Sequence, residues 1–192
     1  YERYMLSQNP QSLALETAKK ATGNIFLDNY VLDFLDVPEP MSEHDLQKSI
    51  IRNLKDFILE IGKDFTFVGE EYRVQVGNHD FFIDLLFYHR GLSCLVAFEL
   101  KIGEFKPEYV GQINLYLEAL DREVKKENEN PSVGIILCAS KDDEVVEFAL
   151  SRSLSPTMVA EYNLKLIDKK LLQKKLKEYI ELAKLTAEEE NS

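Results

Sequence analysis

Cysteine, basic charge and long apolar runs are all scarce in this chain of 192 residues. The two cysteines, Cys94 and Cys138, each lie inside an apolar stretch, which indicates buried thiols rather than a disulfide framework or a zinc site. No apolar run approaches the roughly 20 residues that a membrane-spanning helix needs, and the first residues lack the layout of a signal peptide. We therefore expect a cytoplasmic protein with no membrane partner.

Acidic residues outnumber basic residues by 34 to 23, which gives a net charge of −11. This balance argues against a domain that holds nucleic acid mainly through a broad basic surface, so any such contact must be local, metal-assisted or supplied by another region or subunit. The three histidines have no ligand spacing and are assigned no role. The chain starts at Tyr1 rather than Met, which suggests a fragment that lacks an N-terminal region.

Apolar residues make up 45% of the chain, enough for one full core. Their spacing predicts helices over residues 11–21, 28–35, 42–62, 107–120, 142–150 and 168–185. Alternating or wholly apolar runs predict strands over residues 65–76, 80–89, 93–101, 132–138 and 159–162. We expect a helical preamble and linker over 1–40, a central domain over 41–165, and an amphipathic helix with a tail over 166–192.

The order of these elements indicates the fold class. Three strands joined by short turns predict an antiparallel meander, and the helix and the strand that follow them add a further layer. Ser42 and Asp45 form a capping-box pattern at the start of the helix that precedes the meander. The sequence therefore predicts an α/β fold with a central mixed sheet flanked by helices.

Three charged residues interrupt otherwise apolar strands: Asp84, and then Glu99 and Lys101. Side chains two residues apart on a strand share a face, so Glu99 and Lys101 emerge together. If the two strands form a hairpin around Arg90 and Gly91, Glu99 faces near Phe82, and Asp84 lies about one residue pair away. Two carboxylates and one ammonium group then converge at one edge of the sheet.

This set of side chains suits a divalent metal ion. Mg²⁺ (or Mn²⁺) takes oxygen ligands from one or two carboxylates and leaves the rest of its shell to water and substrate phosphate. Asp84, Glu99 and the carbonyl of Leu100 are the expected ligands. The ion would activate a water and neutralise phosphate charge, and Lys101 would orient that water or stabilise the transition state. The expected reaction is hydrolysis of a phosphodiester.

Four further residues are candidates for accessory roles. Glu60, near the end of a helix, is an additional acidic ligand or a partner of the ligands, with an exposed helix position as the equal alternative. Gln112 and Tyr116 lie four residues apart on one helix face and can contact substrate or Lys101, although a polar face with a tyrosine at the core edge explains them equally well. Lys106 can reach a phosphate.

Simpler interpretations exist for the three central residues. A Glu-x-Lys pair at a strand end is usually a solvated edge, and structural ion pairs also perturb pKa values. A buried salt bridge between Asp84 and Lys101 would satisfy both charges without chemistry. A carboxylate inside an apolar strand is nevertheless costly without a partner, and a functional site explains both Asp84 and Glu99 at once.

The motifs resemble those of the YhcG-like family of PD-(D/E)xK nucleases over about residues 42–149. The resemblance rests on stretches 67–69 and 84–89, on Glu99-Leu100-Lys101, and on stretches 105–109, 111–112 and 116–117. It implies a restriction-endonuclease-like fold, a Mg²⁺ requirement and a DNA substrate, with Asp84, Glu99 and Lys101 as the catalytic set. It also implies an accessory role for Glu60 and a Gln-x-x-x-Tyr motif at Gln112 and Tyr116. The preamble is similar to the segment that joins the family's DNA-binding-like N-terminal region to its nuclease domain. Ile83 replaces the proline that names the class.

Three functions of different kinds follow from these observations. The first is a Mg²⁺-dependent deoxyribonuclease, an endonuclease or processing nuclease that acts as a homodimer if two active sites must meet one duplex. The second is a catalytically inactive DNA-binding or assembly module that keeps the fold. The third is an interaction domain in which Asp84, Glu99 and Lys101 form a closed ion-pair cluster. The complete triad favours the enzyme.

Overall fold

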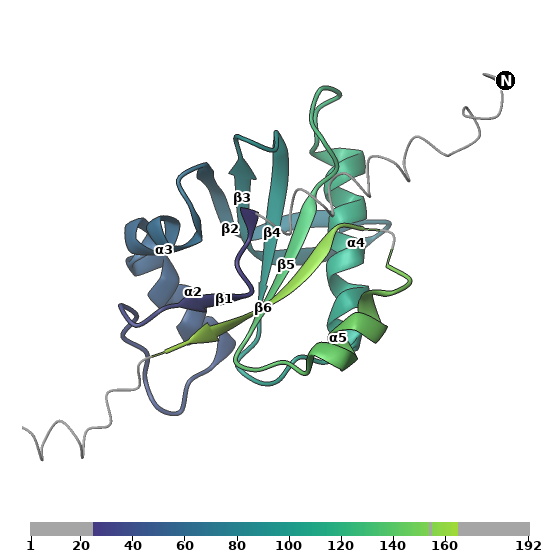
Figure 1. Cartoon of the computed structure of the whole chain (residues 1–192). Helices are drawn as coiled ribbons and strands as arrows, with labels where there is room; N and C mark the ends of the chain where they lie inside the picture. Colours follow the sequence, from purple (N-terminus) through teal and green to yellow (C-terminus); the bar gives the residue numbers. More distant parts are fainter. Residues whose placement is uncertain (1–24, 154, 165–192) are drawn as a thin grey trace, which may run out of the picture.

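A central sheet separates two groups of helices in the computed structural model, which describes residues 25–153 and 155–164 (Figure 1). The strands are β1 (Asn29–Val31), β2 (Phe65–Val76), β3 (His79–His89), β4 (Cys94–Leu100), β5 (Val133–Cys138) and β6 (Thr157–Asn163). The helices are α2 (Glu43–Arg52), α3 (Leu54–Ile61), α4 (Glu108–Glu123) and α5 (Asp143–Leu150). The helices expected over 11–21 and 168–185 lie outside the described residues.

The sheet is mixed, as the sequence predicts. Its strand order is β1-β6-β5-β4-β3-β2. The pairs β1–β6, β6–β5 and β5–β4 are parallel, whereas β4, β3 and β2 form the expected antiparallel meander. The turn between β2 and β3 falls at Gly77 and Asn78, where Gly77 takes φ 61°, a conformation that costs glycine little. Parallel β4 and β5 are buried at every position, because helices cover both faces of the sheet.

Each face of the sheet has its own apolar core. One core joins the sheet to α2 and α3 through residues such as Leu46, Ile50 and Phe57. The other joins it to α4 and α5, with Ile113 and Leu117 at its centre. The β4-α4-β5 and β5-α5-β6 connections place both of the later helices on the same side (Figure 1). None of the helices within the described part of the chain is long and apolar enough to cross a membrane.

The helix expected over residues 28–35 is wrong, because this stretch begins with β1. Tyr30 is fully buried while Asn29 and Val31 are exposed, which is the alternation of a strand. Backbone groups of Asp28 and Leu32 bond to β6, with Asp28 O accepting from Glu161 N at 2.9 Å. A local apolar pattern cannot reveal this pairing, since its partner lies more than 100 residues later in the chain.

The single helix expected from Ser42 to Gly62 is also wrong, because it is interrupted at Asn53. The Asn53 side-chain amide donates to Ser49 O at 2.9 Å, so that it competes with the helical backbone for this acceptor. The N-terminus is as expected, with Ser42 and Asp45 forming both hydrogen bonds of a capping box. The break at Asn53 separates α2 from α3.

Candidate active site

The three central residues meet where β3 and β4 separate. The β3–β4 ladder ends at the pair Leu85 and Phe98. Beyond this pair β4 continues beside β5, whereas β3 continues beside β2. The carboxylate of Asp84 enters the resulting fork, and its Oδ2 accepts a hydrogen bond from Leu100 N at 2.7 Å. A side chain thus takes the place of a strand partner at this point of β4.

The observed register differs from the expected one by two residues. His89 pairs with Cys94, so the turn spans residues 90–93 rather than Arg90 and Gly91 alone. Ser93 takes φ 51° within this longer turn. The change removes Glu99 from the expected neighbourhood of Phe82, because Phe98 now pairs with Leu85. Asp84 and Glu99 follow this last pair on their two strands, and the charge of Asp84 acts on Glu99.

Glu99, near the end of β4, and Lys101, which directly follows the strand, form a buried ion pair. Glu99 is 2% exposed and Lys101 is 8% exposed. Lys101 Nζ donates to Glu99 Oε1 at 2.9 Å, while the other carboxylate oxygen, Oε2, is buried without a hydrogen-bond partner. Buried polar atoms are nearly always satisfied, so an unpartnered carboxylate oxygen needs an explanation.

The electrostatics of the cluster disfavour two bare carboxylates. Burial, and then the charge of Asp84, raise the pKa of Glu99 to about 7 despite its bond to Lys101. Burial also raises the pKa of Asp84, although the Leu100 N–H and Lys101 oppose the change. Burial lowers the pKa of Lys101, but the hydrogen bond and charge of Glu99, together with the charges of Glu43 and Asp84, raise it above its usual value. Added positive charge would relieve the repulsion between the acids.

Aromatic residues fix the position of Lys101. Its backbone N–H donates to Leu137 O at 2.8 Å, and its carbonyl accepts from the Tyr162 hydroxyl at 3.1 Å. Its Nζ lies 4.9 Å from the centre of the Tyr109 ring, within the range of a cation–π contact. Sequence reasoning assigned no role to Tyr109 or Tyr162, because neither contact can be anticipated without the positions of α4 and β6.

The acidic residue that a helix contributes to the cluster is Glu43, not Glu60. Glu43 Oε2, in the first turn of α2, lies 3.7 Å from Lys101 Nζ, and its charge also acts on Asp84 and Glu99. Glu60 Oε1 instead accepts a hydrogen bond from Val31 N in β1 at 2.7 Å. No pattern in the sequence singles out Glu43, since an acid in a first helical turn is common for electrostatic reasons alone.

The structure places Tyr116 within range of the charges of Glu99 and Asp84 and leaves Lys106 at the surface. Gln112 Nε2 donates to the Tyr116 hydroxyl at 2.8 Å. Tyr116 is buried, and its pKa is raised by burial and by the charges of Glu99 and Asp84. Lys106 is exposed in the loop between β4 and α4. Gln112 and Tyr116 therefore form a polar pair on the α4 side of the cluster.

The donor set fits a divalent cation held by few protein ligands. Among the described residues, no three or more histidine, cysteine, aspartate and glutamate side chains gather closely enough to hold a metal ion. Asp84 and Glu99 nevertheless supply two adjacent carboxylates, and Glu99 Oε2 is an acceptor with no protein donor. One or two carboxylates are the usual protein share of a Mg²⁺ site, where water and substrate complete the shell.

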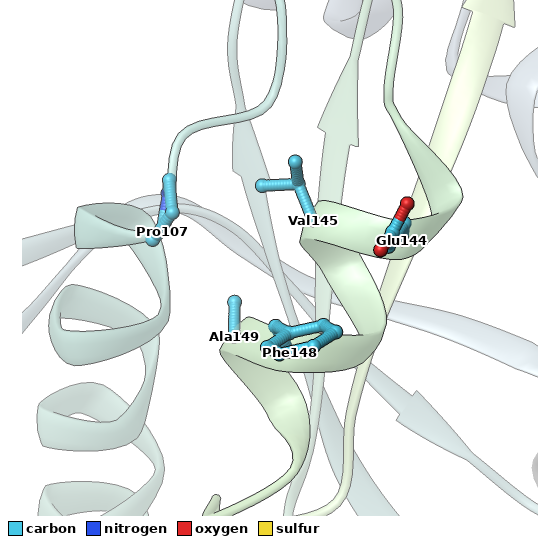
Figure 2. A pocket seen from close by; sticks show the side chains of 5 residues that line it. All are labelled: Pro107, Glu144, Val145, Phe148 and Ala149. Carbon is cyan, nitrogen blue, oxygen red and sulfur yellow. The ribbon is translucent and has the colours of Figure 1, made fainter.

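A separate cavity of about 490 Å³ lies between α4 and α5. Pro107, at the start of α4, lies across from Val145 on α5, and Glu144, Phe148 and Ala149 complete the lining (Figure 2). This lining is mostly apolar and contains a single carboxylate and no cationic side chain. It shares no residue with the Asp84 cluster, so it is not the candidate active site.

A mixed sheet that carries an aspartate on one strand and Glu-x-Lys on the next defines the PD-(D/E)xK class, with a restriction-endonuclease-like fold. A family model described as the YhcG PDDEXK nuclease domain matches residues 23–177, and the chain belongs to this family. The YhcG protein of Escherichia coli (strain K12) is 36% identical over 180 residues, which cover 92% of this chain and 48% of that protein. The chain thus spans about half the length of this curated relative.

Two solved structures are also similar. One is a repair endonuclease from Pyrococcus abyssi, with 19% identity and a TM-score of 0.43 over 66% of this chain and 49% of that one. The other is EndoMS in its apo form, with 20% identity and a TM-score of 0.43 over 65% of this chain and 48% of that one.

Proposed function

We propose that this chain is a metal-dependent nuclease that hydrolyses DNA phosphodiester bonds at the fork between β3 and β4. The observation that carries the proposal is the buried Glu99 carboxylate beside Asp84, with Oε2 unpartnered. A closed structural ion-pair cluster would be stable only with its remaining polar atoms satisfied, so this orphaned oxygen favours a site that takes a further ligand. Membership of a nuclease domain family supports the same conclusion.

Asp84, Glu99 and the Leu100 carbonyl are the proposed ligands of a Mg²⁺ or Mn²⁺ ion. When bound, such an ion lowers the pKa of a coordinated water and stabilises charge on the phosphate. Leu100 N holds the Asp84 carboxylate through Oδ2, and Lys101 holds Glu99 through Oε1. Each acid is therefore oriented by one protein donor, as ligands with hydrogen-bonded outer partners usually are.

Lys101 is the proposed catalytic cation. Its backbone contacts to Leu137 and Tyr162 and its position over the Tyr109 ring limit the positions its ammonium group can take. From there it can orient a water for attack and stabilise negative charge on the phosphoryl oxygens. Glu43, on its other side, helps to keep the ammonium group charged.

Substrate contacts are proposed for three residues around the cluster. Gln112 and Tyr116 present an amide and a hydroxyl from α4. Lys106 is exposed in the loop that follows β4, where it can bind a phosphate of the DNA backbone. With a net charge of −11, the chain depends on such local contacts rather than on a broad basic surface.

The wider assembly is also a proposal. The curated relative is about twice as long as this chain. We place the start of the nuclease domain at about residue 25 rather than 41, because β1 pairs with β6 and Tyr30 lies in the core. The residues before it would join the domain to a preceding region that binds nucleic acid or a partner, and 166–192 would follow it. A homodimer would place two active sites on one duplex.

The experiment that tests the proposal compares branched, linear and single-stranded DNA, and RNA, as substrates in Mg²⁺ or Mn²⁺. The native chain should cut at least one DNA substrate only when the metal is present, and Glu99→Ala should cut none. Cleavage confined to RNA would overturn the proposed substrate. Binding of DNA without any cutting would instead identify an inactive binding module.

A further inference from the structure

Strand β3 changes its orientation at Asp84. Leu85 and Phe87 pack into the core beneath α2 and α3, whereas Ile83 and Leu86 pack into the core beneath α4. Residues two apart on a regular strand share a face, so the opposite placement of Ile83 and Leu85 requires a twist between them. This twist is centred on the residue that supplies the first carboxylate of the cluster.

Asp84 also lies outside both ladders of its strand. The pairs of β3 with β2 step from Leu85–Glu70 to Ile83–Tyr72 and omit Asp84 and Glu71. Glu71 takes φ 44°, an uncommon conformation for a residue with a side chain. The ladder pairs thus hold Ile83 and Leu85 on either side of Asp84 but not Asp84 itself, whose carbonyl takes its donor from another source.

That source is Gln47, a buried residue of α2. Gln47 is 4% exposed, and its Nε2 donates to the Asp84 carbonyl at 2.9 Å. Gln47 follows Glu43 by four residues, so both lie on one face of the helix. Glu43 is directed to Lys101, which directly follows β4, and Gln47 to Asp84 on β3. One helix face thus contacts both branches of the fork.

We infer that Gln47 is a positioning residue of the nuclease site. It holds the twisted backbone of β3 at Asp84, which keeps the Asp84 carboxylate on Leu100 N and beside Glu99. It touches the backbone rather than a carboxylate, so it acts only through Asp84. The effect of Gln47 on catalysis rests on the proposed function. Its effect on the position of Asp84 can be measured in metal-free protein.

The test compares Gln47→Met, which removes the amide and keeps a similar shape, with Ser49→Ala. Ser49 is a matched control, because it is also buried on α2 and its hydroxyl also donates to a backbone carbonyl, that of Asp36 at 3.0 Å. Hydrogen exchange of the Leu100 amide in metal-free protein is the first measurement, expressed relative to the slowest amides of β4. If a variant only lowers global stability, amides that exchange through global unfolding all exchange faster by the same factor. The ratio of the Leu100 amide to the slowest β4 amides then stays the same.

In Gln47→Met the relative exchange of the Leu100 amide should rise at least about tenfold, and Mn²⁺ affinity measured by calorimetry should fall by about 10–100-fold, the usual effect of removing an outer partner. Ser49→Ala should change neither. An unaltered Leu100 ratio in Gln47→Met overturns the inference, and Gln47→Leu provides the same test if the Met variant does not fold. Native protein that binds no Mn²⁺ would overturn the proposed function, while the exchange ratio would still decide whether Gln47 positions Asp84.

Discussion

At the scale of single residues, the sequence predicted which three charged side chains meet but not their surroundings. Asp84, Glu99 and Lys101 stand out because charge interrupts apolar strands, and the structure brings all three together. Glu43 and Gln47 have no such signal, because a glutamate and a glutamine on an amphipathic helix are ordinary. Their importance arises from the position of α2 over the fork, which depends on tertiary packing.

The contrast between Glu43 and Glu60 provides a matched pair of variants. Glu43→Gln removes the acid that lies 3.7 Å from Lys101 Nζ, so metal-dependent cleavage should fall by about 10–100-fold. Glu60→Gln alters an acid bonded to β1 and should leave the cleavage rate within about twofold of the native rate, a small effect in free-energy terms. Initial rates on one DNA substrate measure both. Equal losses in the two variants would contradict the assignment of Glu43 to the site.

A second residue-scale prediction concerns His89, which is 4% exposed at the end of β3. Its Nδ1 accepts a hydrogen bond from Leu92 N, and burial lowers its pKa despite the opposing charge of Asp64. The unfolded chain then binds a proton more readily than the folded protein does. The stability that the fold gains from keeping His89 neutral is complete above about pH 6.5, the usual histidine pKa. It is lost as the pH falls toward the lower pKa of His89 in the folded protein.

Urea unfolding at pH 7 and pH 5 measures this effect. The native protein should lose more unfolding free energy between these two pH values than His89→Phe, whose ring suits the neighbouring Phe26 and Phe65. His79→Gln, at an exposed histidine, is the control and should follow the native protein. A His89→Phe variant with the native pH dependence would show that His89 is not responsible.

At the scale of helices and strands, local patterns predicted most elements and failed where a distant partner decides. The strands from β2 to β6 and helices α4 and α5 appear close to their expected bounds. The helix expected over 28–35 was wrong, since β1 pairs with β6 and the side chain of Tyr30 is buried in the core. The two-residue error in the β3–β4 register has a local origin instead, because the turn at 90–93 is longer than two residues.

The packing of α4 on β5 leads to a stability prediction at this scale. A Cβ on Gly134 would lie 2.6 Å from Ile113 Cγ1 and 3.1 Å from Leu117 Cδ1, so Gly134→Ala should destabilise the fold by about 1–3 kcal/mol. Gly111 lies within α4, and a methyl group added there would meet nothing within 4 Å, so Gly111→Ala should stabilise the fold by about 0.5–1 kcal/mol. Denaturant unfolding distinguishes the two. A neutral Gly134→Ala would show that α4 can move away from the sheet.

At the scale of the whole molecule, a strongly acidic chain supports a nuclease domain through local arrangement rather than overall charge. The fork between β3 and β4 gathers two acids and one cation, α2 adds Glu43, and α4 adds Gln112 and Tyr116. The family match covers residues 23–177, so these contacts lie inside the shared domain. From composition we inferred that any contact with nucleic acid must be local. Composition could not reveal the fork, because the fork depends on where β3 and β4 separate.

The most direct test of the central claim is nicking of supercoiled DNA in Mg²⁺ by native protein and by Glu99→Gln. The variant keeps the shape of the side chain while it removes the charge that a metal ion would need. We expect cutting by the native protein that stops when the metal is chelated, and a rate at least about 100-fold lower in the variant, as for loss of roughly 3 kcal/mol of transition-state stabilisation. Equal cutting by both proteins, or cutting that continues without metal, would contradict the assignment of a metal-dependent nuclease site to Asp84, Glu99 and Lys101.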